Sequence, residues 1–104
     1  MRRDIFQAIA DPVRRDIIGL LAQKPRTVNT VADNFEISRP AVSKHLKILN
    51  ECGLIEIYKK GRKRYCQIQP NNLKQISEWV EQYRTLWEEK LESFENYLNQ
   101  LQKK

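Results

Sequence analysis

The sequence of 104 residues has few of the residues that build metal sites, disulfide frameworks and catalytic centres. It contains two cysteines, Cys52 and Cys66, and a single histidine, His45. Two cysteines are too few for a disulfide framework and lack metal-ligand spacing. One imidazole without a recognisable nucleophile motif supplies neither a triad nor an oriented general base. These absences argue against an enzyme, and we expect no cofactor.

Long apolar runs are also missing. No stretch approaches the roughly 20 apolar residues that a membrane-spanning helix requires. The first residues, Met1-Arg2-Arg3-Asp4, lack the apolar core of a secretory signal. With 40% hydrophobic and 31% charged residues, the chain has the composition of one small folded domain. We therefore expect a cytoplasmic protein without a membrane partner.

Positive charge is abundant and concentrated. The chain has 19 Lys and Arg against 13 Asp and Glu, a net charge of +6. Residues 1–69 hold 14 basic and 7 acidic side chains, which gives +7, whereas residues 70–104 hold 5 and 6, which gives −1. Within residues 39–64, eight basic residues face only Glu51 and Glu56. A local positive field on a structured segment indicates a nucleic-acid partner, although a solvated surface is the plainer alternative.

Capping residues and apolar spacing predict four helices in the first part of the chain. A short helix over residues 2–9 precedes Asp11, which can cap a second helix with Pro12 in its first turn. Thr27 can cap a short third helix, and Ser38 a fourth over residues 38–52. Because the break between the last two comprises only about residues 36–37, they are expected to form a tight helix-turn-helix.

A β-hairpin is expected next. Gly53 ends the fourth helix, and alternating apolar residues predict strands over residues 54–59 and 64–69, joined by a tip at residues 60–63. The fold class is therefore mainly α with a small β-hairpin, a winged helix-turn-helix. We expect residues 1–69 to form this part and residues 70–104 to form a long C-terminal helix packed in the same domain.

The C-terminal segment has apolar residues at spacings of three and four, a near-heptad pattern with one stutter. A helix from Leu73 to Leu101 would be about 42 Å long, more than one small body can cover. The same helix of a second copy is the simplest cover. We expect the dimer interface to include Phe6, Leu73, Ile76, Val80, Tyr83, Trp87, Leu91, Phe94 and Leu98.

The fourth helix should expose a basic face once Val42, Leu46 and Leu49 point inward. Such a face suits the major groove of DNA, where Arg and Lys can bond guanine and Ser can bond a base or phosphate. A cationic hairpin, with five wing cations at Lys59, Lys60, Arg62, Lys63 and Arg64, suits the phosphate backbone or minor groove. The predicted DNA-binding residues are Arg39, Pro40, Ser43, Lys44 and Lys47 on the helix and Lys60, Arg62, Lys63 and Arg64 on the wing.

Two sequence blocks carry a family resemblance. The segments Asp11-Pro12-Val13-Arg14-Arg15-Asp16-Ile17-Ile18 and Ile37-Ser38-Arg39-Pro40-Ala41-Val42-Ser43-Lys44-His45-Leu46-Lys47-Ile48-Leu49 resemble the ArsR/SmtB family of winged-helix repressors. The resemblance spans residues 5 to about 70. It implies a homodimer that recognises DNA through the fourth helix and a wing, with repression relieved by a signal. By the family pattern, Arg39, Pro40, Ser43 and Lys44 lie nearest the bases.

The sequence departs from the metal-sensing members of that family. Their Cys-x-Cys pair in the third helix is replaced by Thr27 and Asn29, and the last helix has no His, Cys or Asp. The chain thus resembles the branch without metal sites, and no metal is expected. Several alternatives stay open: a redox switch at Cys52 and Cys66, a ligand pocket at Trp79 and Trp87, a small-molecule or protein inducer, and a winged-helix protein or RNA adaptor. The expected function is a homodimeric repressor of an inverted-repeat operator in double-stranded DNA.

Overall fold

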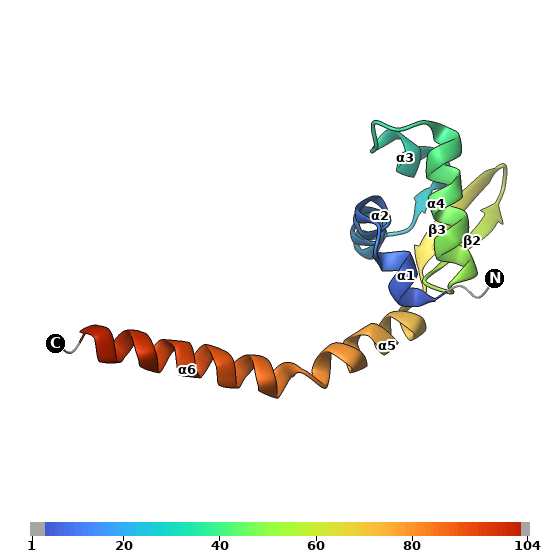
Figure 1. Ribbon diagram of the computed structural model, residues 1–104. Coiled ribbons are helices and arrows are strands. Elements are labelled where there is room, and N and C mark those ends of the chain that lie inside the picture. Colours follow the sequence, from blue (N-terminus) through green and yellow to red (C-terminus); the bar gives the residue numbers. More distant parts are fainter. Residues whose placement is uncertain (1–3, 103–104) are drawn as a thin grey trace. The chain divides into compact units, whose positions relative to one another are not determined.

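The computed structural model describes residues 4–102, which fall into two compact units divided between Lys74 and Gln75. The first unit contains α1 (Ile5–Ile9), α2 (Pro12–Gln23), β1 (Arg26–Thr27), α3 (Val28–Asp33), α4 (Arg39–Glu51), β2 (Ile55–Lys60) and β3 (Lys63–Ile68) (Figure 1). The helix α5 (Pro70–Glu81) contains the division, and α6 (Arg84–Gln102) belongs to the second unit. A mainly helical winged helix-turn-helix is thereby confirmed.

The expected capping residues begin the helices of the first unit. Asp11 Oδ1 accepts hydrogen bonds from the backbone N–H groups of Val13 and Arg14 at 2.8 and 3.2 Å. Thr27 and Ser38 are the N-caps of α3 and α4. These side chains satisfy backbone donors that have no partner within the helix. The expected first helix is shorter than predicted, since α1 begins at Ile5 with Asp4 as its cap, and residues 2–3 lie outside the described residues.

One core lies between the helices and the sheet of the first unit. The predicted inward residues of α4, Val42, Leu46 and Leu49, are all buried. In α2, Ile17 and Leu21 are buried, while Val13 and Leu20 are half-buried. The complete buried set is Ile5, Ala8, Ile17, Leu21, Val31, Ala32, Val42, Leu46, Leu49, Cys52, Leu54, Ile55 and Cys66. This core fixes α4 with its polar face outward.

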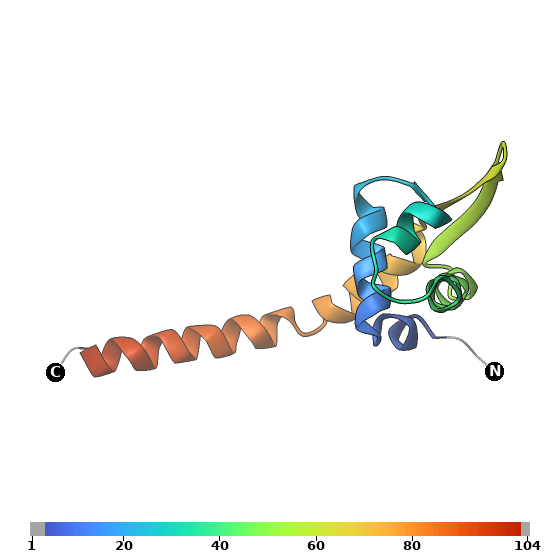
Figure 2. The same ribbon diagram turned by 90° about the horizontal axis from the view of Figure 1, so that it is seen from above.

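The sheet has three antiparallel strands in the order β1-β3-β2. The two-residue strand β1 was not predicted, because its residues Arg26 and Thr27 have no apolar alternation and it forms only by pairing with Cys66 and Tyr65. The hairpin β2–β3 extends away from the helices of its unit (Figure 1 and Figure 2). Its strands are displaced by one residue from the prediction, so that Lys60 and Lys63 form the last pair.

Two other boundaries differ from the predictions. The break between α3 and α4 comprises residues 34–38 rather than about two residues, because α3 ends at Asp33. The helix expected over residues 70–104 is interrupted at residues 82–83. There the Tyr83 N–H donates to the Val80 carbonyl at 3.0 Å, a tightened turn, and the rings of Trp79 and Tyr83 meet edge-on with centroids 5.2 Å apart. Residues 103–104 lie outside the described part.

Candidate nucleic-acid interface

Local chemistry defines both ends of the helix α4. Ser38 Oγ accepts a hydrogen bond from the Ala41 N–H at 3.2 Å, and Pro40 occupies the first turn. At the other end, Gly53 has φ +73°, and the Leu54 N–H donates to the Leu49 carbonyl at 3.0 Å. A left-handed residue with this bond is the Schellman ending of a helix. Gly53 thus ends α4 as predicted.

The predicted DNA-binding side chains of α4 are all exposed. Because Val42, Leu46 and Leu49 point into the core, the opposite face carries Arg39, Pro40, Ser43, Lys44 and Lys47. Glu51, four residues after Lys47 at the end of α4, is exposed on the same side, so the face is free of carboxylates only from Arg39 to Lys47. It therefore offers cationic and hydroxyl donors to a groove of a nucleic acid.

The wing is a hairpin with a tight turn. Gly61 has φ +65°, and with Arg62 it forms the two-residue loop beyond the Lys60–Lys63 pair. The tip is therefore narrower than the expected four residues. The rings of Tyr58 and Tyr65 stack across the strands with centroids 5.7 Å apart. The predicted wing residues Lys60, Arg62, Lys63 and Arg64 are all exposed.

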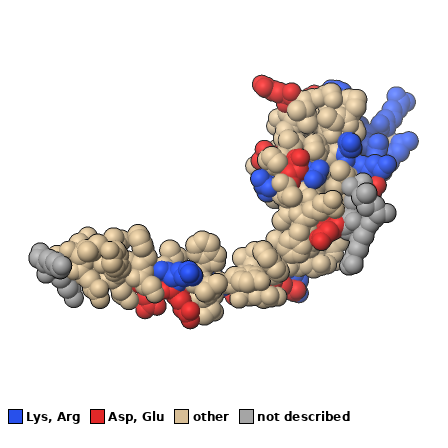
Figure 3. Space-filling view, in the orientation of Figure 1, with Lys and Arg blue, Asp and Glu red and all other residues tan. Residues whose placement is uncertain are grey.

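Two open hollows border the wing. The first, of about 520 Å³, lies between α4 and β2 and is lined by Ser43, Lys47 and Asn50 of α4 with Lys59 and Arg64 of the hairpin. The second, of about 460 Å³, lies between the start of α3 and the wing and includes Arg62, Lys63 and Arg64. Arg64 lines both hollows, and neither has a carboxylate in its lining. Figure 3 shows Lys and Arg gathered over the hairpin.

These hollows bring together only part of the predicted set. Ser43, Lys47, Arg62, Lys63 and Arg64 line them, as does Lys59, the fifth wing cation. Pro40, Lys44 and Lys60 are exposed but do not line either hollow.

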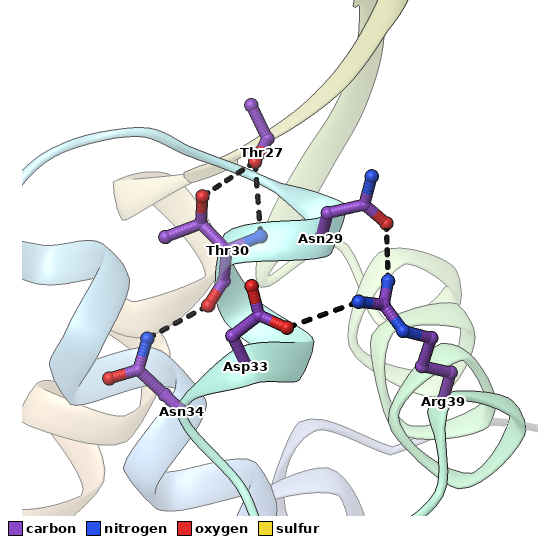
Figure 4. A network of polar contacts seen from close by, with 6 residues as sticks. All are labelled: Thr27, Asn29, Thr30, Asp33, Asn34 and Arg39. Carbon is purple, nitrogen blue, oxygen red and sulfur yellow. Dashed lines mark hydrogen bonds and ion pairs between the residues drawn. The ribbon is translucent and has the colours of Figure 1, made fainter.

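Arg39 is bonded to α3, which the sequence did not predict (Figure 4). Its Nη1 donates to Asn29 Oδ1 at 2.7 Å, and its Nη2 donates to Asp33 Oδ1 at 3.1 Å. Both partners of the ion pair are exposed, with 61% of the Arg39 side chain and 69% of the Asp33 side chain accessible. The available signal was the spacing of Asn29 and Asp33, which places both on one face of α3.

His45 is half-buried and packed against α2. Arg14 Nη1 lies 3.2 Å from His45 Nδ1. The nearby Asp11 carboxyl is also affected: partial burial raises its pKa, but hydrogen bonds from the Arg14 and Val13 N–H groups, together with the charges of His45 and Arg14, outweigh burial and lower the pKa below its usual value. His45 thus has a structural partner within the protein.

The two cysteines are free thiols inside the first unit. Cys66 is fully buried in β3, and Cys52 is buried at the end of α4, where its Sγ lies 3.6 Å from the Asp4 carbonyl. Burial raises the pKa of the Cys66 thiol to about 11, against a small opposing effect of the Arg64 charge. A protonated, buried thiol is a poor nucleophile. This environment weighs against a redox switch at Cys66.

The positions that hold the Cys-x-Cys pair in metal-sensing relatives do not suit a metal here. Thr27 Oγ1 caps α3, and Asn29 Oδ1 accepts from Arg39. Within residues 4–102, no cluster of three or more His, Cys, Asp or Glu side chains is arranged to hold a metal ion. The hydroxyl and amide at these positions are also poor ligands for a transition metal.

The candidate dimer residues of the second unit form an uncovered apolar surface. None of the described residues 75–102 is buried. Six of the predicted interface side chains are 41% to 65% exposed, namely Val80, Tyr83, Trp87, Leu91, Phe94 and Leu98. Leu73 and Ile76 are half-buried, and Phe6 in the first unit is 37% exposed. A set of large apolar side chains this exposed is typical of an interface.

The two tryptophans have different surroundings. Trp87 lines an apolar hollow of about 280 Å³ with Tyr83, Leu86 and Lys90, whereas Trp79 packs against Tyr83. The hollow is formed within one segment of the chain. Trp79 does not line this hollow.

Among residues 4–102, no helix combines the length and the apolar character that crossing a bilayer requires.

Comparison with known sequences gives consistent results. A profile of the family described as "Bacterial regulatory protein, arsR family" matches residues 11–56. The chain is similar to the transcriptional repressor SdpR of Bacillus subtilis (strain 168), with 35% identity over 77 residues that cover 74% of this chain and 86% of that protein. The region matched by the family profile contains α2, α3 and α4, including the basic face of α4.

Solved structures share the same architecture. A crystal structure of an ArsR family transcriptional regulator has a TM-score of 0.72 and 38% identity, covering 81% of this chain and 92% of the other. The homodimeric winged helix-turn-helix DNA-binding domain of a possible ArsR-family regulator from Mycobacterium bovis has a TM-score of 0.63 and 25% identity, covering 77% of each chain. The winged helix of the first unit thus has close counterparts among regulators.

Proposed function

Since the chain belongs to the ArsR family of bacterial transcriptional regulators, we propose that it is a cytoplasmic, homodimeric repressor that binds an inverted-repeat operator. In this proposal α4 enters the major groove, and the wing lies on the backbone or in the minor groove. The observation that carries the proposal is the pair of carboxylate-free hollows that join α4, the start of α3 and the wing around Arg64. The cationic lining of these hollows is complementary to the negative charge of a phosphodiester strand.

The geometry of a duplex supports this assignment. A strand of the backbone separates the major groove from the minor groove, so a protein that occupies both grooves must accommodate that strand between its two contacts. The hollow between α4 and β2 is lined by Lys47, Lys59 and Arg64, which can contact phosphates there. Ser43 and Arg39 lie on the exposed face of α4, where bases would be read. Phosphate contacts thus position the protein, and α4 specifies the sequence.

The apolar surface of the second unit supports a homodimer. Trp87, Leu91, Phe94 and Leu98 follow one another at spacings of three and four along α6, and all are exposed. A second copy offers the same surface, as an isologous two-fold interface requires. Two copies of α4 would then contact half-sites about 34 Å apart on one face of the duplex. This spacing makes an inverted repeat the natural operator.

Selection from a randomised library of duplex DNA tests the proposal. We expect the wild-type protein to enrich an inverted repeat with half-sites about one helical turn apart. Arg64→Gln should weaken binding to selected and random duplexes alike and should reduce the slope of affinity against salt by about one ion, because a phosphate contact carries no sequence information. Enrichment of no sequence, or of a single half-site by a monomer, would refute the operator model.

A further inference from the structure

We propose that Asn29 and Asp33 are specificity-determining residues, which position the Arg39 guanidinium for a base contact. This inference rests on the proposed function, because it requires that α4 read DNA. Arg39 Nη1 donates to Asn29 Oδ1 at 2.7 Å, and Arg39 Nη2 donates to Asp33 Oδ1 at 3.1 Å (Figure 4). Two acceptors on two different nitrogens fix the plane of the guanidinium as well as its location.

Arg39, Asn29 and Asp33 form a clamp, and α3, which carries both acceptors, is held by hydrogen bonds at its two ends. Asn29 and Asp33 are four residues apart on α3, so they share one face of that helix. At the N-terminus, Thr27 Oγ1 accepts from the Thr30 N–H at 3.1 Å and donates to Thr30 Oγ1 at 2.8 Å. At the C-terminus, Asn34 Nδ2 donates to the Thr30 carbonyl at 2.8 Å. These hydrogen bonds hold the short helix α3, and with it the two acceptors Asn29 Oδ1 and Asp33 Oδ1.

The clamp leaves Arg39 able to bind a base. A guanidinium has five N–H donors, of which the two contacts to α3 use two. The other donors can serve the O6 and N7 acceptors of guanine. Arginine loses much rotamer freedom when it is ordered, and a side chain already held in the free protein loses less on binding. The clamp thus favours the contact for which Arg39 is preorganised.

The charge of Asp33 adds a second effect. A carboxylate 3.1 Å from the guanidinium reduces the net attraction of this pair for any phosphate. A hydrogen bond from Arg39 to a base depends on direction and distance more than on net charge, so it is reduced less. Asp33 thereby disfavours sequence-independent contacts of Arg39. Discrimination between partners often depends on such an unfavourable element for the wrong one.

A purely competitive role of Asp33, in which it withholds Arg39 from DNA, predicts a different result. If Asp33 only competed with DNA for Arg39, its removal would release the guanidinium and increase affinity for the preferred site. If Asp33 positions Arg39, its removal lowers the ratio of specific to random affinity. Competition therefore predicts a gain in affinity for the preferred site when Asp33 is removed, whereas positioning predicts a loss of discrimination between the preferred site and random DNA.

The test compares full-length variants on a duplex selected by the wild-type protein and on a random duplex of equal length. We expect Asp33→Ala to lower the ratio of the two affinities by about three- to tenfold, within the range for coupled neighbouring residues. Asn29→Ala, which changes no charge, should lower the ratio in the same direction. Both variants should relax base preference at the same position of the site as Arg39→Ala does, and neither should change the ratio of the two affinities further in the Arg39→Ala background.

Asp16→Ala is the matched control, because it removes one negative charge from an exposed position of α2 in the same unit. We expect it to raise both affinities slightly and to preserve their ratio. Thermal unfolding of each variant verifies the fold. A wild-type protein that binds both duplexes equally would overturn the proposed function itself. Wild-type discrimination that Asp33→Ala and Asn29→Ala retain, or that Asp33→Ala increases, would overturn the positioning role alone.

Discussion

Arg14 Nη1 lies 3.2 Å from His45 Nδ1, so an arginine of α2 bonds to a side chain in the middle of the recognition helix. A guanidinium only donates, so this contact is a hydrogen bond in the form of His45 whose Nδ1 is unprotonated. The same arginine donates from Nε to the Ala8 carbonyl at 2.6 Å and from Nη2 to the Gln7 carbonyl at 3.3 Å. Arg14 therefore connects α1, α2 and α4.

Replacement of Arg14 by Ala should lower the free energy of unfolding by about 1–2 kcal/mol, because part-buried acceptors on two helices lose their donor. Arg15→Ala is the control. Its Nη1 makes an exposed bond to the Ile9 carbonyl at 2.7 Å, and we expect a loss of no more than about 0.5 kcal/mol. Urea unfolding measures both. Equal losses would show that Arg14 has no special role in joining the helices.

Asp11 should contribute to the acid sensitivity of the fold. Its pKa in the folded protein is below the ordinary value of 3.8. The stabilisation is therefore fully present above that ordinary value and is lost as pH falls through the lower pKa of the folded state. Asp11→Ser keeps a capping oxygen without a titrating group, so its stability should fall less between about pH 5 and pH 2. Unfolding curves over this range measure the difference, and identical acid limbs would contradict the assignment.

Two glycines of the first unit should respond oppositely to Ala. A Cβ at Gly53 would meet the Asn72 side chain, and the backbone there has φ +73°. We expect Gly53→Ala to destabilise the protein by more than about 1 kcal/mol. Gly19 lies inside α2 with open space around it, so Gly19→Ala should stabilise by about 0.5–1 kcal/mol. Thermal unfolding of the pair checks both signs, and a stabilising Gly53→Ala would contradict the described ending of α4.

Cys66 should react with thiol reagents only after the fold opens. The side chain is fully buried, and its pKa is raised to about 11. In the unfolded chain the thiol ionises near its usual value of 9.0, so the folded state loses relative stability as pH rises above that value toward 11. Labelling of a Cys52→Ala variant, followed with and without urea, measures the reaction at Cys66 alone. Rapid labelling of the folded variant at pH 7 would reopen the redox alternative.

The dimer proposal predicts a charge-sensitive surface on α6. Leu91→Glu places a carboxylate within the apolar face and should produce a monomer at micromolar concentration, because an unpaired buried charge is costly. Ser93→Glu adds the same charge about 200° around the helix and should leave the dimer intact. Light scattering distinguishes the two states. A wild-type monomer under these conditions would remove the homodimer from the proposal.

Local chemistry was predictable from the sequence, whereas contacts between distant segments were not. Asp11, Ser38 and Gly53 act on their own neighbours, so their roles follow from residue type and position. Helical spacing likewise identified Val42, Leu46 and Leu49 as the inward side of α4. In contrast, β1 exists through its partner strand, and the interruption at residues 82–83 lies within a continuous apolar pattern. The strand β1 has no distinct local signal, and the interruption adjoins the one stutter in the apolar spacing, which begins at Tyr83.

The candidate interface shows the same division. Exposure of the basic residues followed from the core-facing pattern of α4 and from the charge of the hairpin. The bonds from Arg39 to Asn29 and Asp33 required the angle between α3 and α4, which is set by the core rather than by the bonded residues. Lys59 was predictable as a wing cation from its charge and its place in the hairpin, but the hollow that it lines was not.

Thr27 belongs to two elements at once, because it is the last residue of β1 and the N-cap of α3. As a strand residue it pairs with Tyr65 of β3, which leads out into the wing. On the proposed function, a displacement of β3 would therefore reach the start of α3 through the pairing of Thr27 with Tyr65. A duplex that bends enough to shift the wing would therefore also tilt the helix that holds Arg39, so DNA shape and base reading would be sensed together.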